Sequence, residues 1–467
     1  MSGLDEGAGH AFGLALLNFS AWVRRQAWLG AIYRRFPAQW RNNVSAALAA
    51  PAHRRLRFER STKWLTSLRD LPAESLREPT AGIVPFEGGV NVHAYLRGQF
   101  GLAENARLYA RALLANGYPV ALCDIDIALP HSLDDRSLDA WIGKNAPYDV
   151  DIIFVNPDFL DEALSRMPHS PGKSPYVIAC WFWELEQFPR DWLPAIDRVD
   201  EVMVASVFVE DAVKRVTDKP VTRVPVPVDD VPDSGLQRED FGLDPGVFIF
   251  LCTFDFNSFL ERKNPFAAID AFRKAFAPGR MDVRLVIKSS NGHRHPERLR
   301  EVLNAVEGDG RILIRDDVID RAHVHALQRC CDAYVSLHRS EGFGLGLAEA
   351  MRQGKPALAT GYSGNLEFMN PGNSILVGYR LVPVEEGEYA HHEGQHWAEA
   401  DTSEAATGMR RLVDEPGLAR RIGDQAAVDI REHFSREACA SALVARLGAV
   451  HASISGRRSV AVGKGRP

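Results

Sequence analysis

Apolar and polar positions follow two recurring patterns along the chain from about residue 82. Short unbroken apolar runs predict buried strands, and apolar residues at helical spacing predict amphipathic helices. In the first half, helices are predicted at residues 106–117 and 207–216. Strands are predicted at residues 88–96, 150–156, 175–183, 200–206 and 221–228. Strands that alternate with helices favour a parallel sheet covered by helices.

The alternation begins again after a segment rich in proline and aspartate at residues 225–235. Here helices are predicted at residues 264–276, 323–330 and 346–354, and strands at residues 246–256, 282–290, 310–316, 331–338 and 356–360. The chain is therefore predicted to have an α/β fold with two doubly wound, Rossmann-like domains that face a cleft. In sheets of this kind, ligands bind at the carboxyl ends of the strands.

Four segments follow from these boundaries: a helical extension at residues 1–80, an N-terminal domain at 81–228, a C-terminal domain at 229–430, and a helix with a basic disordered tail at 431–467. Between residues 11 and 69 the extension has eleven Lys or Arg, four Trp and a single acid, Glu59. This composition is typical of a segment that lies on an anionic membrane surface. An extension packed on the body with a solvated basic face would have the same composition, so both interpretations remain open.

Composition excludes several classes of function. A formal net charge of -6 gives no sign of nucleic-acid binding, so no nucleic-acid partner is expected. The six cysteines form no C-x-x-C pair, and a reducing cytoplasm fits them best. The N-terminus has acids where a secretory signal would be basic, and we expect neither a cleavable signal nor a membrane span. A cytoplasmic protein is predicted, peripheral on the inner face of the plasma membrane if the extension binds lipid.

The stretch "SEGFGLGLAEAMRQGKP" at residues 340–356 combines a turn with the start of a helix. Gly342 and Gly344 let backbone N–H groups turn toward a phosphate, and the helix dipole adds positive charge at the same place. The spacing fits neither a dinucleotide fingerprint nor a Walker loop, since no G-x-G-x-x-G/A and no G-K-[ST] is present here. An anion site of another kind is predicted.

Two carboxylates flank this turn. Glu341 precedes the helix and Glu349 lies inside it, so a rise of about 1.5 Å per residue separates them by roughly 10–12 Å. That distance suits the two ends of a nucleoside diphosphate sugar, with Glu341 near the sugar and Glu349 at the ribose hydroxyls. Each glutamate taken alone could equally be a solvated or capping carboxylate.

The pair in "EGFGLGLAEAM" resembles the donor-site motif of retaining glycosyltransferases of the group 1 type, glycosyltransferase family 4, which have the GT-B fold. Three further stretches are similar to that family, namely "FNSFLERKNPFAAIDAF", "LVIKSS" and "TGYSGNLEFM". The resemblance implies a hexosyltransferase that moves a sugar from a nucleoside diphosphate sugar to a saccharide or lipid-linked saccharide acceptor, as in bacterial surface polysaccharide or lipopolysaccharide assembly. A catalytically silent scaffold that binds a sugar nucleotide is the alternative.

The resemblance also implies a set of site residues. Glu341 is expected to be catalytic and to act near the transferred sugar, and donor binding is assigned to Arg262, Lys263, Lys288, Gly342, Phe343, Gly344, Leu345 and Glu349. Arg262 and Lys263 would neutralise the departing diphosphate, so we expect neither a metal nor a cofactor.

The first domain is expected to supply the acceptor side, and the family's usual histidine is missing from the matching region "CWFWELEQFP". Glu184 is predicted to be catalytic there, with Glu186 as a second candidate. Gly98, Gly101 and Trp183 are predicted to contact the acceptor, because glycine allows close approach and a tryptophan ring can stack on a sugar. Buried aromatic residues with surface acids would give the same pattern.

One motif points to a different class of protein. "HEGQH" at residues 392–396 satisfies the H-E-x-x-H pattern of zinc proteases. That site requires both histidines on one face of a stable helix, whereas this copy contains Gly394 and follows a loop-like stretch. A metalloprotease is therefore disfavoured.

Overall fold

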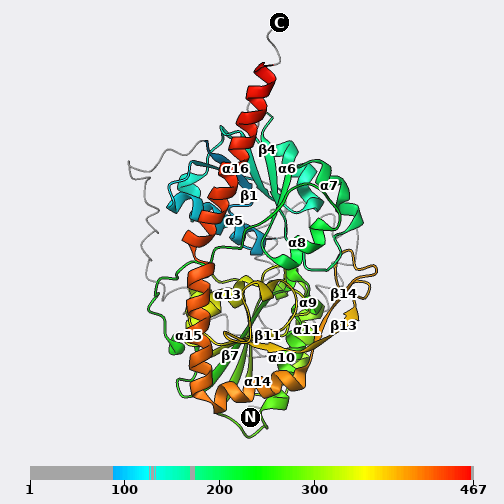
Figure 1. The fold of residues 1–467 in the computed structure, drawn as a ribbon. Coiled ribbons are helices and arrows are strands. Elements are labelled where there is room, and N and C mark those ends of the chain that lie inside the picture. Colours follow the sequence, from blue (N-terminus) through cyan, green and yellow to red (C-terminus); the bar gives the residue numbers. More distant parts are fainter. Residues whose placement is uncertain (1–87, 126, 128–130, 132, 169–173, 464–467) are drawn as a thin grey trace, which may run out of the picture.

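The computed structural model describes the chain except for residues 1–87, 126, 128–130, 132, 169–173 and 464–467. The described residues form two α/β domains, one above the other in Figure 1. Helix α15 (Pro416–His433) runs beside the lower domain and helix α16 (Arg436–Gly463) beside the upper one. The prediction of two Rossmann-like domains is confirmed. The extension at residues 1–80 lies outside the described residues, so its membrane interpretation stays a prediction.

The first domain is built on a six-stranded parallel sheet with the order β2-β1-β3-β4-β5-β6. Its strands are β1 Val90–Ala94, β2 Val120–Asp124, β3 Val150–Phe154, β4 Tyr176–Cys180, β5 Glu201–Val204 and β6 Val221–Arg223. Every residue of β1 and β3 is buried, and their polar side chains pair: Asn91 Nδ2 donates to Asp151 Oδ1 at 2.6 Å. The helices of this domain are α5 Gly101–Ala115, α6 Leu160–Arg166, α7 Leu193–Asp197 and α8 Val207–Lys214.

Helix α5 begins earlier than predicted. A helix was predicted from residue 106, but it starts at Gly101. Phe100 occupies the N-cap and makes no side-chain capping bond, so no Ser, Thr, Asp or Asn marks this start in the sequence. The helix therefore begins directly beside the carboxyl end of β1, where a ligand is expected.

The second domain has six parallel strands in the order β12-β11-β10-β7-β8-β9. They are β7 Phe248–Asp255, β8 Val283–Ser290, β9 Ile312–Asp316, β10 Ala333–Ser336, β11 Ala357–Thr360 and β12 Ile375–Val377. The order reverses between β7 and β10, which is the switch point of a Rossmann sheet. The helices are α9 Leu260–Lys263, α10 Pro265–Ala275, α11 Pro296–Ala305, α12 Arg321–Cys330, α13 Leu345–Arg352, α14 Thr402–Asp414 and α15 Pro416–His433.

Short 3-10 helices join several of these elements. They lie at Asp139–Trp141, Pro157–Phe159, Arg190–Trp192, Arg238–Phe241, Phe256–Ser258, Gly292–Arg294 and Gly364–Glu367. All six cysteines are buried and free, which agrees with the absence of a disulfide pattern in the sequence.

An antiparallel hairpin leaves the second domain after β12. Strand β13 (Tyr379–Pro383) pairs with β14 (His396–Ala400), so that Tyr379 lies opposite Ala400. The H-E-x-x-H motif lies at the end of the connecting loop, where Gly394 has a left-handed φ of 70° and His396 already belongs to a strand. The two motif histidines therefore share no helix, and the zinc-protease pattern is accidental.

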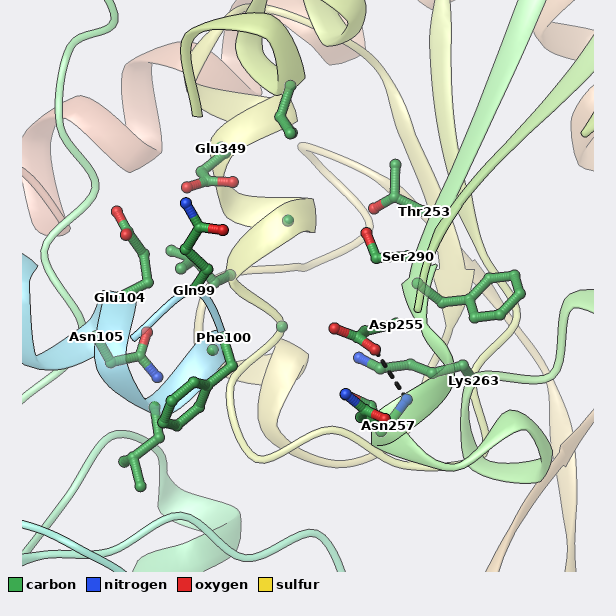
Figure 2. A pocket seen from close by; sticks show the side chains of 18 of the residues that line it. Gln99, Phe100, Glu104, Asn105, Thr253, Asp255, Asn257, Lys263, Ser290 and Glu349 are labelled. Atoms are coloured by element: carbon green, nitrogen blue, oxygen red, sulfur yellow. Dashed lines mark hydrogen bonds between the residues drawn. The ribbon is translucent and has the colours of Figure 1, made fainter. Parts of the chain in front are cut away.

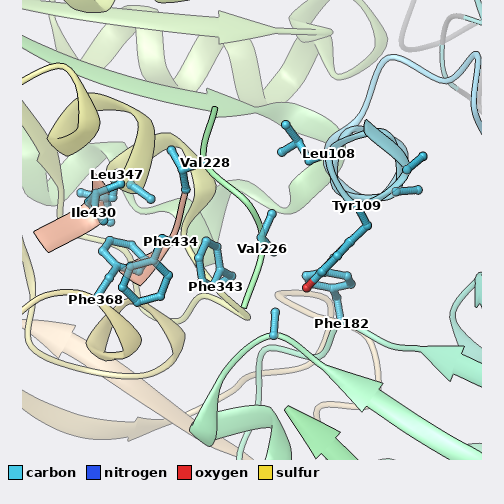
Figure 3. Close-up of a cluster of buried hydrophobic side chains, with 14 of the residues drawn as sticks. Leu108, Tyr109, Phe182, Val226, Val228, Phe343, Leu347, Phe368, Ile430 and Phe434 are labelled. Atoms are coloured by element: carbon cyan, nitrogen blue, oxygen red, sulfur yellow. The ribbon is translucent and has the colours of Figure 1, made fainter. Parts of the chain in front are cut away.

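A hydrophobic cluster continues across the junction of the two domains. Val226 of the connecting segment lies between Tyr109 on the first-domain side and Phe343 on the other, and Val228 lies near Phe343 and Phe434 (Figure 3). All five side chains are at most 6% exposed. The junction between the two domains is therefore a packed core.

The last helix returns to the first domain. Helix α16 (Arg436–Gly463) packs against α5, and Arg446 Nη2 donates to the buried carboxylate of Glu201 at 2.6 Å. A helix followed by a disordered tail was predicted for residues 431–467, and the helix α16 extends to Gly463. By length and composition alone, Pro416–Gly456 could also cross a membrane; in the fold it comprises α15 and most of α16, which pack on α13 and α5.

Candidate active site

A cavity of about 480 Å³ lies between the two domains. It is lined by residues at the carboxyl ends of β7 and β8, at the start of α13 and, from the first domain, at the start of α5. Figure 2 shows Gln99, Phe100 and Asn105 on one side and Thr253 and Asp255 on the other. This is the switch point of the second sheet, and the volume is in the range of small-molecule sites.

The predicted glycine turn leads into the first turn of α13. Gly344 occupies the N-cap with a φ of 94°, a left-handed angle that favours glycine. Among the described residues no side chain caps this helix, so its first N–H groups and the positive end of its dipole can meet an anion. Gly342, Phe343 and Leu345 line the cavity beside it. The predicted strand, turn and helix are confirmed.

Residues 340–344, here called the motif loop, are fixed by hydrogen bonds to both domains. Ser206 Oγ of the first domain donates to the carbonyl oxygen of Gly342 at 2.6 Å, and Gly364 N donates to that of Glu341 at 2.8 Å. A Cβ atom on Gly342 would lie 3.1 Å from the backbone oxygen of Trp183. Glycine at this position therefore lets the first domain approach the loop closely.

Two cations of α9 hold the carboxylate of Glu341. Arg262 Nη1 donates to Glu341 Oε2 at 3.2 Å and to the carbonyl oxygen of Ser340 at 3.0 Å, and Lys263 Nζ donates to Glu341 Oε1. Burial alone would raise the pKa of Glu341, but Lys263 and Arg262 lower it to about 2. All three side chains line the cavity, so the cations and the carboxylate predicted at distant sequence positions form one cluster.

The free energy of unfolding is expected to decrease as the pH falls from about 4.5 to about 2. The pKa of Glu341 is lowered from 4.5 to about 2 in the folded chain, so its ionised form stabilises the fold above pH 4.5 and this contribution is lost on acidification. Complete loss corresponds to about 3 kcal/mol. Urea unfolding at a series of pH values measures it.

Glu341→Gln is the matched control for this pH dependence, because glutamine does not titrate. The unfolding free energy of this variant should change less with pH over the same range. An identical pH dependence in both proteins would show that Glu341 does not carry the effect.

Lys288, the third predicted cation, lies near the end of β8. Its Nζ donates to Ser290 Oγ at 2.6 Å; burial lowers the pKa of Lys288, and Asp255 opposes this effect. Asp255, which the sequence interpretation did not single out, ends β7 and accepts from Asn291 Nδ2 at 2.9 and 3.0 Å. Its position at a strand end was the signal that could have found it. Within the described part of the chain, no group of three or more His, Cys, Asp or Glu could hold a metal ion.

Glu349 lies in α13 on the far side of the cavity from α9. Its carboxylate pairs with Arg321, the first residue of α12, and Arg321 Nε lies 3.4 Å from Glu104 Oε1 of the first domain. Burial would raise the pKa of Glu104, but Arg321 and Arg107 lower it to about 2. Arg321 thus joins carboxylates of the two domains, and the sequence interpretation missed it because its partners lie far away in the chain.

The residues predicted in the first domain divide into two groups. Glu184 and Gly101 line the cavity, and a Cβ atom on Gly101 would meet open space. The predictions for the other two residues, Gly98 and Trp183, were wrong. Gly98 does not line the cavity; its carbonyl accepts from Arg107 Nη1 at 2.6 Å, and the ring of Phe100 lies 2.4 Å from where its Cβ would be.

Trp183 was predicted to stack on a sugar, but the structure buries it. The residue is 2% exposed, its Nε1 donates to the carbonyl oxygen of Gln187 at 2.9 Å, and its ring packs edge-on against Trp192. It does not line the cavity. Trp183 is therefore a core residue that supports the backbone of its neighbour Glu184.

Comparisons with known proteins agree with this geometry. Residues 247–392, which include every residue predicted to bind the donor, match the family model described as glycosyl transferases group 1. This stretch, less than a third of the chain, is similar in sequence to group 1 glycosyl transferases. A curated relative, the trehalose synthase of Rubrobacter xylanophilus, is 25% identical over 177 residues. That match covers 37% of this chain and 37% of the relative, so it spans well under half of either protein.

Solved structures share the whole two-domain arrangement. Sucrose-phosphate synthase from Thermosynechococcus elongatus superimposes with a TM-score of 0.55 at 16% identity, over 79% of this chain and 100% of that one. A glycosyltransferase from Rickettsia africae gives 0.55 at 13% identity, over 79% and 99%. HepE from Anabaena, solved in complex with UDP and glucose, gives 0.52 at 14% identity, over 77% and 100%. The chain has the GT-B fold.

Proposed function

We propose that this protein is a glycosyltransferase that moves a sugar from a nucleoside diphosphate sugar to a saccharide or lipid-linked saccharide acceptor. The observation that carries the proposal is the meeting of Arg262, Lys263 and the uncapped start of α13 in one interdomain cavity. Fixed cations and helix N–H groups together suit a diphosphate. The UDP and glucose bound to HepE, which has the same fold, support this choice of ligand.

Departure of the nucleoside diphosphate places negative charge on its phosphates, and the reaction is faster when that charge meets preorganised donors. In the proposal Arg262 and Lys263 supply this stabilisation without a metal, while Glu341 keeps both cations in place. Glu349 accepts hydrogen bonds from the ribose hydroxyls, and Glu184 faces the sugar from the first domain. Transfer with retention of configuration, in which the leaving phosphate takes the proton of the acceptor hydroxyl, is the stereochemistry that the family resemblance favours.

The biological setting is also a proposal. A lipid-linked acceptor would fit a cytoplasmic enzyme that the basic, tryptophan-rich residues 11–69 attract to an anionic membrane. Such acceptors are used in the assembly of bacterial surface polysaccharide. A catalytically silent scaffold would bind the donor as the enzyme does, but it would not turn the donor over.

The decisive experiment exposes the purified full-length protein to UDP, GDP and ADP sugars. Binding at 100 times the Kd should stabilise the fold by about 2.7 kcal/mol, which a thermal shift detects. Release of the nucleoside diphosphate, with and without EDTA, then measures turnover and its need for a metal. Binding without release of a nucleoside diphosphate in any acceptor mixture would favour the scaffold, and no binding at all would overturn both interpretations.

Glu349→Ala is expected to weaken binding of the nucleoside diphosphate about 10–100-fold, because hydrogen bonds to a charged group contribute about 1.5–3 kcal/mol. The kcat at saturating donor should change much less, since the ribose is remote from the reacting bond. Isothermal titration and initial rates give the two values. The control is Glu301→Ala, which removes an exposed glutamate of α11 that does not line the cavity. A larger fall in kcat than in affinity would place Glu349 at the sugar end instead.

A further inference from the structure

The loop between β13 and β14 reaches from the second domain onto the first. Gln395 Nε2 donates to the carbonyl oxygen of Gln187 at 2.7 Å, and Gln187 N donates back to Gln395 Oε1 at 3.2 Å. Val384, Tyr389 and Trp397 belong to the same buried cluster as the aromatic core of the first domain. A segment that follows the second sheet in sequence thus completes the packing of the first domain.

Tyr389 of this loop contacts a cavity residue of the first domain. Its Oη donates to Glu184 Oε2 at 2.5 Å, while Glu184 Oε1 lies 3.8 Å from Arg262 Nη2. The phenol is 9% exposed and does not line the cavity, whereas Glu184 does. Burial and then Glu184 raise the pKa of Tyr389 well above its ordinary value, so the hydroxyl remains a donor at any working pH.

The ring of Tyr389 is held independently of its hydroxyl. Its centroid lies 4.7 Å from that of Phe259 and 5.8 Å from that of Trp183, and the guanidinium of Arg262 lies 5.8 Å from the same ring. Removing the oxygen alone therefore leaves the packing of the ring in place. The hydroxyl can be tested separately from the fold.

We propose that Tyr389 is a positioning residue that holds one oxygen of Glu184, so that the other oxygen accepts a hydrogen bond from a sugar hydroxyl in the cavity. This inference rests on the proposed glycosyl transfer. It implies that the second domain contributes to both sides of the reaction, through the motif loop on the donor side and through the hairpin on the side of Glu184. Orientation of a reacting group matters because small misplacements slow a reaction strongly.

The chain contains a matched contact that lies outside the cavity. Tyr362 Oη donates to Glu186 Oε1 at 3.1 Å, and Tyr362 is 5% exposed. This bond also joins a tyrosine of the second domain to a glutamate of the first, two residues beyond Glu184. Neither Tyr362 nor Glu186 lines the cavity. Tyr362→Phe therefore removes the same kind of bond between domains without reaching the cavity.

The test compares Tyr389→Phe and Tyr362→Phe in the full-length protein, with kcat, donor KM and thermal stability measured for each. Tyr389→Phe should lower kcat about 10–100-fold, the effect of one hydrogen bond to a charged group, and change donor KM less than about threefold. Tyr362→Phe should leave both constants near those of the wild type. In a Glu184→Gln background, Tyr389→Phe should have little further effect on kcat, because both changes act on one carboxylate.

The possible outcomes separate this inference from the proposed function. An active wild type whose two phenylalanine variants have equal kcat values would overturn the positioning role and leave the transferase intact. Full additivity of Tyr389→Phe and Glu184→Gln would also overturn it, because Tyr389 would then act through another group. A wild type that is inactive with every nucleotide sugar would overturn the proposed function and this inference together.

Discussion

Lys263→Met is expected to lower the rate of sugar transfer by about two to three orders of magnitude, which is the usual effect of removing one preorganised donor to developing charge. Lys263 lines the cavity, and within the described part of the chain the carboxylate of Glu341 is the only one in hydrogen-bond range of its ammonium group. An ammonium has three donors, so the remaining two can reach a diphosphate. Methionine keeps the length and apolar stem of the side chain and removes only the charge.

The affinity for the nucleoside diphosphate should fall in the same variant, by about 1.5–3 kcal/mol for a lost charge-assisted bond. Single-turnover rates and titration calorimetry measure the two effects. Lys274→Met is the matched control, since this lysine lies in the next helix, is about half exposed and does not line the cavity. If Lys263→Met and Lys274→Met have the same rate and affinity, the diphosphate lies elsewhere in the cavity.

The side of the cavity formed by the motif loop and α13 could be predicted from the sequence because its parts are local. Glu341, Gly342, Gly344 and Glu349 fall within nine consecutive residues, and a strand followed by a helix fixes their relative positions. Strands β7 and β8 of the second domain have eight residues each and contain apolar runs, so this sheet was also recognisable. The long-range step that places α9 beside the motif loop came from the family resemblance.

The first-domain side could not be predicted in the same way, because contacts between distant residues decide it. Tyr389 and Glu184 are 205 positions apart, and nothing near either residue indicates their contact. Trp183 was expected to be available to a sugar, but the hairpin loop covers it with Tyr389, whose ring lies 5.8 Å away. Neither strand of that hairpin was predicted, since β13 is mostly exposed and has no continuous apolar run.

The exact ends of helices are also only partly predictable from the sequence. The helix α13 was predicted to start at residue 346 and starts at Leu345, because glycines mark the turn before it and Gly344 adopts a left-handed angle there. The start of α5 was missed because Phe100 offers no capping side chain. Local sequence therefore predicts a helix end only where a capping group or a backbone constraint is written at that position.

Gly364→Ala is expected to lower transfer activity at least about 100-fold, because a displacement of about 1 Å at a reacting site is sufficient for such a loss. A Cβ atom at this position would lie 2.2 Å from the carbonyl oxygen of Gly342 and 2.6 Å from that of Glu341. Both atoms belong to the backbone of the motif loop, so no side-chain rotation can relieve the overlap. The loop, and with it the carboxylate that holds Arg262 and Lys263, would have to move.

The effect of Gly364→Ala comes from steric overlap alone. Gly364 does not have a left-handed φ angle, so alanine would not strain the backbone there. Overpacking of this kind also destabilises a fold by about 1–3 kcal/mol, so urea unfolding and kcat should be measured together. Gly417→Ala is the control, because a Cβ there would meet nothing within 4 Å in the exposed first turn of α15. A Gly364→Ala variant with wild-type kcat would mean that the motif loop can shift without disturbing the reaction, and Glu341 would then lose its assigned role as the anchor of the two cations.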